Sequence, residues 1–120
     1  MMGRENAVAE KAISFAIRIV NCCKYLQEEK KEFIMSKQLL RSGTSIGANI
    51  HEGIFAQTRA DFVTKLSISL KEASETSYWL TILHKTDYLT TEMYDSIKVE
   101  IDEIIRILIS SLNTTKKNAD

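Results

Sequence analysis

The sequence contains no proline, and only four of its 120 residues are glycine. Because proline interrupts helices and glycine marks tight turns, this shortage favours long helices joined by short connections. No run of about 18 apolar residues occurs, so no transmembrane helix is expected. The chain also opens without the charged and then apolar leader of a secreted protein. Both absences predict a cytoplasmic protein that does not associate with membranes.

Cysteine is scarce, and net charge is absent. The two cysteines, Cys22 and Cys23, are neighbours in a predicted helix and face different directions, so neither a disulfide within the chain nor a cysteine-based zinc site is expected. Sixteen basic and sixteen acidic side chains cancel. The overall charge therefore points neither toward nor away from nucleic acid as a partner.

The chain is rich in helical periodicity, which divides it into four segments. We expect helices from residue 5 or 6 to about 28, from 33 to about 55, from a capping box at Thr58–Asp61 onward, and from 91 to about 112. Charged or polar connections lie at 28–32 and 87–90. This pattern predicts an all-α, up-down-up-down four-helix bundle, with residues 1–120 as a single domain and residues 1–4 and 113–120 flexible.

The stretch from Gln38 to Gly53 is helical in rhythm but rich in small residues. Its apolar and small positions share one side of a helix: Leu40, Gly43, Gly47, Ile50 and Ile54. A glycine within a helix costs about 0.5–1 kcal/mol relative to alanine, so two of them indicate a neighbouring helix that packs closely. We expect that neighbour to be the third helix, which carries Ser69, Ala73 and Thr76 at the same spacing.

Polar residues within these segments predict structural ion pairs. Arg41 and Asn49 interrupt the small-residue stretch, and Glu52 ends it. We expect buried or half-buried pairs that fix the register of the second and third helices. The residues concerned are Arg41, Asn49, Glu52, Glu72 and Glu75.

Two helices carry more apolar residues than a single core face needs. In the first, a second stripe of Ile13, Ala16, Val20 and Cys23 suggests a helix covered on more than one side. In the fourth, surplus apolar residues crowd the last turns, and we expect them to contact another copy of the chain: Ile105, Ile109 and Leu112. The sequence therefore predicts a homo-oligomer.

Several motifs resemble those of a known family. They are Gln38–Gly53, Asp61-Phe62, Lys65-Leu66 and Lys71–Leu80. Together they resemble the small bacterial four-helix-bundle family that is often encoded in intervening sequences of the large ribosomal RNA gene. The same superfamily includes the accessory variability protein of diversity-generating retroelements. The resemblance implies a homopentameric barrel, and for the retroelement member a contact with nucleic acid and reverse transcriptase.

Catalysis and metal binding find little support in the sequence. It has no Gly-x-Ser-x-Gly elbow, no glycine-rich phosphate loop and no dinucleotide fingerprint. A di-iron bundle needs Glu-x-x-His on two helices, whereas this chain has Glu72-x-x-Glu75, Glu100-x-x-Glu103 and the pair His51-Glu52. We therefore expect no enzyme, no catalytic residue, no cofactor and no metal. A metal-binding bundle is the third and weakest hypothesis.

Nucleic-acid binding is the leading hypothesis. Arg4, Lys11 and Arg18 recur every seven residues and line one strip of the first helix, and Lys37 lies on the second. A few cations bind phosphate weakly, but an oligomer repeats the strip and multiplies the contacts. The sequence thus predicts a non-enzymatic scaffolding or binding protein for RNA or DNA. The alternative is a protein–protein interaction module whose oligomer binds a protein partner through the apolar end of the fourth helix.

Overall fold

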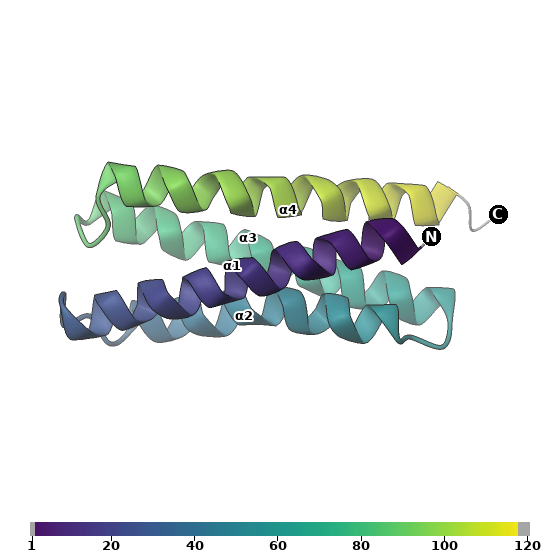
Figure 1. The fold of residues 1–120 in the computed structure, drawn as a ribbon, viewed down its shortest axis with the longest axis horizontal. Coiled ribbons are helices and arrows are strands. Elements are labelled where there is room, and N and C mark those ends of the chain that lie inside the picture. Colours follow the sequence, from purple (N-terminus) through teal and green to yellow (C-terminus); the bar gives the residue numbers. More distant parts are fainter. Residues whose placement is uncertain (1, 118–120) are drawn as a thin grey trace.

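The protein folds into four long antiparallel helices. The computed structural model describes the backbone of residues 2–117 and the side chains of residues 6–117. Its helices are α1 (Met2–Glu28), α2 (Met35–Ile54), α3 (Arg59–Lys85) and α4 (Thr91–Lys117). They alternate in direction and form a bundle about 50 Å long and 21 by 19 Å across (Figure 1). The predicted all-α, up-down-up-down bundle is confirmed.

The helices are longer at both ends of the chain than the sequence predicted. Residues 2–4 belong to α1, and residues 113–117 continue α4. Near the end of α4, Ser111 and Leu112 are buried, and the Thr115 hydroxyl donates to the Ser111 carbonyl at 2.8 Å. These contacts hold the last turns in place. Residues 1 and 118–120 of the segments expected to be flexible lie outside the described residues.

The start of α3 is fixed by the predicted cap. The amide of Asp61 donates to the Thr58 hydroxyl at 3.0 Å, and Thr58 has the extended backbone of an N-cap residue. This bond satisfies one of the amides that the first helical turn leaves unpaired. The N-terminal half of the capping box is therefore confirmed.

The core is a single apolar layer shared by all four helices. In α1, α3 and α4 the buried residues recur at spacings of three and four, as the periodicity predicted. In α2 the buried face is displaced, because Leu39 and Ile46 are fully buried whereas Leu40 and Ile54 of the predicted face are only partly buried. The largest fully buried side chains of the core are Phe15, Ile19, Leu26, Leu39, Ile46, Ile50, Leu66, Leu80, Leu83, Leu89, Ile101 and Ile104. The packing between α2 and α3 is the most extensive, and that between α1 and α4 is the sparsest.

Gly43 and Gly47 of α2 face α1, which corrects the expectation that they face α3, whereas Gly53 at the end of α2 does face α3, next to Leu66. A Cβ on Gly43 would lie 2.8 Å from Ile19 Cγ2, and one on Gly47 would lie 3.3 Å from Ala12 Cβ. The small residues of α3 meet a different side of α2, since the Ser69 hydroxyl donates to the Ile46 carbonyl at 2.8 Å. Helix α2 is thus packed closely on two sides, by glycine toward α1 and by short hydroxyl side chains toward α3.

We predict that Gly43→Ala destabilises the protein. The added methyl group overlaps Ile19, and overpacking of this kind costs about 1–3 kcal/mol, more than the gain of roughly 1 kcal/mol in helix propensity. Thermal denaturation followed by circular dichroism should show a lower Tm. In an Ile19→Ala background, where the space is free, the same substitution should raise Tm. An increase in Tm in the unmodified background would contradict the close contact.

Candidate functional site

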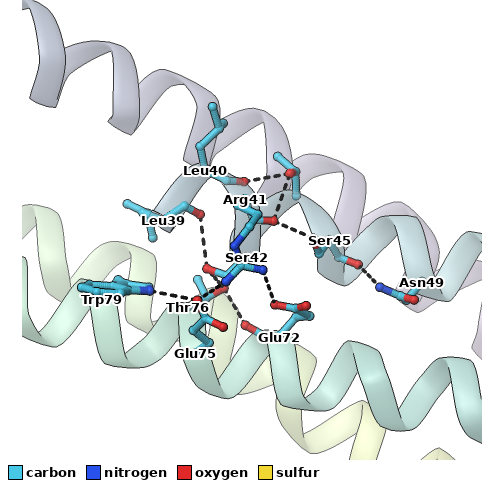
Figure 2. A network of polar contacts seen from close by, with 11 residues as sticks. Leu39, Leu40, Arg41, Ser42, Ser45, Asn49, Glu72, Glu75, Thr76 and Trp79 are labelled. Carbon is cyan, nitrogen blue, oxygen red and sulfur yellow. Dashed lines mark hydrogen bonds and ion pairs between the residues drawn. The ribbon is translucent and has the colours of Figure 1, made fainter. Parts of the chain in front are cut away.

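The motif residues of α2 and α3 meet in a polar network on the seam between these helices (Figure 2). Arg41 Nη1 lies 3.3 Å from Glu72 Oε1, and Nη2 forms a second ion pair with Glu75 Oε2. The indole Nε1 of Trp79 donates to the same Glu75 oxygen at 3.1 Å. The predicted pairing of Arg41 with both glutamates is present, and it links the two helices at one level.

This network lies at the edge of the seam and is half-buried, the shallower of the two alternatives that the sequence suggested. The Arg41 side chain is 49% exposed. Beneath it, the Thr76 hydroxyl donates to Ser42 Oγ at 3.0 Å, and both residues are fully buried (Figure 2). The buried polar contact between α2 and α3 is therefore made by small hydroxyls. They need less desolvation than a guanidinium group does.

Asn49 does not form the expected pair between the second and third helices, whereas Glu52 does. The Asn49 amide donates to the Ser45 carbonyl at 2.8 Å, one turn earlier in α2, so it joins no second helix. Glu52 pairs with Lys65 of α3 at 2.7 Å. Charged contacts thus tie α2 to α3 at two levels, one at Arg41 and one at Glu52.

The ion pairs shift the pKa values of their members in the directions expected of close opposite charges. The pKa of Glu75 is lowered, chiefly by its bond to Arg41 and then by the Trp79 indole. The pKa of Glu52 is lowered by Lys65. The pKa of Arg41 is raised, first by Glu75. All these groups are ionised at neutral pH, and none is held poised for proton transfer.

Two of the four predicted nucleic-acid-binding residues are paired with carboxylates of α4. Lys11 Nζ lies 3.0 Å from Glu103 Oε1, and Arg18 forms an ion pair with Glu100 while also donating to the Ser96 carbonyl at 3.3 Å. These pairs bridge the sparse α1–α4 packing beside a groove of about 420 Å³. The cations predicted to form a phosphate-binding strip are therefore largely neutralised within the chain.

The other two predicted nucleic-acid-binding residues are Arg4 and Lys37. The side chain of Arg4 lies outside the described residues. Lys37 is exposed near the start of α2, and within the described part of the chain its amino group makes no ion pair. Of the predicted set, Lys37 is the residue whose described position leaves it free to meet a phosphate.

The most exposed apolar pair on the helical faces lies on α1 and not at the end of α4. Leu112 is buried in the core of its own chain, Ile105 is partly buried, and Ile109 is exposed. Ile13 and Ile17 are more exposed, at 58% and 59%. With the partly exposed Ala16 and Val20 they form what we call the apolar strip. All of its members except Ile17 belong to the second stripe seen in the sequence. Cys23, the fourth member of that stripe, is buried.

The connection between α1 and α2 is held by Glu32, a residue that the sequence did not single out. The residue is 8% exposed, and its carboxylate accepts hydrogen bonds from the amides of Ile34, Met35 and Ser36 at 3.2, 3.0 and 2.7 Å. It therefore caps α2, whose positive end favours an anion. In the sequence this glutamate stands in a run of five charged residues, which gave no signal for its burial.

Neither the thiols nor the carboxylates form a reactive centre within residues 6–117. Burial raises the pKa of Cys22 to about 11 and that of Cys23 to about 12, so both thiols stay protonated at neutral pH and are poor nucleophiles. Among these residues, no three histidine, cysteine, aspartate or glutamate side chains come together as a metal site would need. No helix in the described part of the chain is sufficiently long and apolar to span a bilayer.

The fold and the packing of α2 define the class of small all-α four-helix-bundle proteins. A family model described as 23S rRNA-intervening sequence protein matches residues 4–110. The chain therefore belongs to the 23S rRNA-intervening sequence protein family, and the resemblance seen in its motifs is confirmed.

A solved structure agrees with this assignment. The crystal structure of a protein of unknown function from the S23 ribosomal protein family of Bacteroides thetaiotaomicron VPI-5482 is 56% identical in sequence. It matches with a TM-score of 0.90 over 92% of this chain and 98% of that chain. The search of curated proteins finds no match.

We predict that Glu75→Gln lowers Tm modestly near neutral pH, on the order of 1–3 °C, because exposed ion pairs contribute little. The folded-state pKa of Glu75 is lowered, so its contribution is present above the unfolded-state pKa and is lost as pH falls through the folded-state value. The Tm difference should therefore shrink below about pH 4. Thermal scans at pH 7 and pH 3, with exposed Glu29→Gln as control, measure it. A difference that grew on acidification would rule out the Arg41–Glu75 pair as its cause.

Proposed function

We propose that the protein is a non-enzymatic scaffold that assembles with copies of itself, as a homopentamer. The observation that supports this most is the apolar strip. Ile13 and Ile17 are one helical turn apart, both more than half exposed, and adjoin further partly exposed apolar side chains. Scattered apolar residues are normal on a surface, whereas a contiguous group of large ones is typical of an interface.

The position of the strip suits contact between helices. Ala12, next to Ile13 in the sequence, packs against Gly47, so the strip follows the outer edge of the close α1–α2 contact. The backbones approach closely there, which leaves a shallow and rigid surface. Burying the exposed part of two isoleucines in a partner would gain about 1–2 kcal/mol for each, a little over half of the value for a fully exposed side chain. The pentameric stoichiometry is carried over from the family resemblance.

The non-enzymatic part of the proposal is supported by what the polar groups do. Glu32, the buried carboxylate of the described core, is engaged by three backbone amides. The thiols have raised pKa values, and the motif carboxylates serve in surface ion pairs. An active site needs a nucleophile or base that is accessible and suitably tuned, and these groups do not fit that role.

We predict that an Ile13→Glu/Ile17→Glu variant dissociates the assembly. Two charges in the strip would have to be desolvated at the interface, so light scattering coupled to size exclusion should find a mass near the 13.7 kDa of one chain. Ile109→Glu, on the α4 surface that the sequence favoured, is the matched control and should keep the wild-type mass. The opposite pattern would place the interface on α4. An unchanged mass in all variants would reject both surfaces.

Nucleic-acid binding is a second candidate, favoured by one observation. Lys37 and the lysines of the α1–α2 connection are exposed and lie apart from the carboxylates that neutralise Lys11 and Arg18. An assembly repeats these free cations, which raises their effective concentration for a polyanion.

We predict affinity for RNA or DNA that falls steeply with salt, because phosphate contacts release counterions. Fluorescence anisotropy with labelled single-stranded RNA and duplex DNA, titrated from about 50 mM salt upward, measures this. The absence of binding to both at the lowest salt would reject the candidate. It would leave a protein–protein module as the remaining function.

A further inference from the structure

We propose that the connection between α1 and α2 is a binding site for single-stranded nucleic acid. This inference rests on the nucleic-acid candidate function and assigns it a place, a strand type and a set of residues. We call these residues the connection patch: Lys24, Lys30, Lys31, Phe33, Ile34 and Lys37.

The cations of the patch come from both helices and from the connection between them. Cys23 Sγ donates to the Ser36 carbonyl at 3.2 Å, and this contact brings Lys24 and Lys37, the next residue on each helix, to the same end of the bundle. Lys30 and Lys31 lie in the connection itself. All four lysines are exposed, and none makes an ion pair within the described residues.

The acidic residues nearby do not cancel these charges. Glu32 is buried and its carboxylate is taken up by three amides of α2. Glu28 and Glu29 remain exposed, so three carboxylates, one of them buried, stand against the four lysines of the patch and leave residues 24–37 with one net positive charge. The result is a locally basic surface on a chain whose net charge is zero. Such a surface attracts phosphates through their charge.

The patch also carries an exposed aromatic ring and an exposed aliphatic side chain. Phe33 is 50% exposed and Ile34 is 78% exposed, although both directly precede a helix. Their backbone is held firmly, because Lys31 adopts a left-handed conformation with φ of 56° and the Ile34 amide is bonded to Glu32. An exposed aromatic ring that neighbours lysines in the chain is typical of a platform for base stacking.

The combination favours a single strand over other polyanions. Stacking on Phe33 requires an unpaired base, which a duplex does not offer. We therefore assign the patch to single-stranded nucleic acid.

The test is fluorescence anisotropy with a labelled single-stranded RNA of mixed sequence, using the whole chain and variants checked by circular dichroism. Lys30→Gln/Lys31→Gln/Lys37→Gln should weaken binding at least tenfold and reduce the salt slope by about 2, since each single-strand phosphate contact contributes roughly 0.7. A triple variant with the same charge change elsewhere, Lys71→Gln/Lys116→Gln/Lys117→Gln, should stay within about twofold of wild type.

The aromatic contribution is tested separately. Phe33→Ala should weaken binding roughly tenfold with the salt slope unchanged, and Phe33→Trp should restore it, because stacking depends on a ring and not on charge. A Phe33→Ala variant that binds as tightly as the wild type would overturn the stacking site.

The other possible results distinguish a failure of the proposed site from a failure of the candidate function. If the wild type binds no RNA, both the site and the candidate function are rejected. If the wild type binds, the connection triple has no effect and Lys11→Gln/Arg18→Gln weakens binding, the function holds but this site is wrong. Sedimentation with phosphatidylserine vesicles tests whether the patch binds an anionic membrane instead. Vesicle binding that Phe33→Ala abolishes, without RNA binding, would overturn the proposal in favour of a lipid surface.

Discussion

The close approach of α1 and α2 at Gly43 and Gly47 is the constraint on which the other surfaces depend. Because these positions have no side chain, Ala12 and Ile19 of α1 pack directly against the backbone of α2. This fixes which side of α1 is buried. As a result, Ile13 and its neighbours lie on the outer side of α1. The end of α1 meets the start of α2 at the connection patch.

Ion pairs bridge helices at contacts that do not involve the two glycines. The α1–α4 packing is sparse and is bridged by Lys11 and Arg18, whereas the α2–α3 seam is covered by Arg41 with two glutamates. Exposed pairs like these add little stability, but they favour one register and discourage others. They also neutralise charged side chains within the chain. Within the described residues, the apolar strip and the lysines of the connection stay exposed, as do single apolar side chains such as Phe55, Tyr78 and Val99.

The sequence predicted the fold well because its signals were local. Helical periodicity, the Thr58 cap and the two glycines each act within a few residues, and the structure bears them out. The partner of the glycines was predicted wrongly, since spacing identifies a face but not the helix that covers it. Glu103, the partner of Lys11, lies 92 residues away in sequence, so the ion pair that neutralises Lys11 could not be predicted. Glu32 stood in a charged run that signals solvent exposure, and only the three-dimensional path of the connection explains its burial.

In the proposed assembly, the apolar strip is covered by other copies of the chain. Sedimentation velocity of the unmodified protein over a wide range of concentrations tests this most directly. The account predicts a discrete species whose mass is a multiple of 13.7 kDa, five chains being the expected number, that persists on dilution. A single species of one chain's mass at every concentration would contradict it.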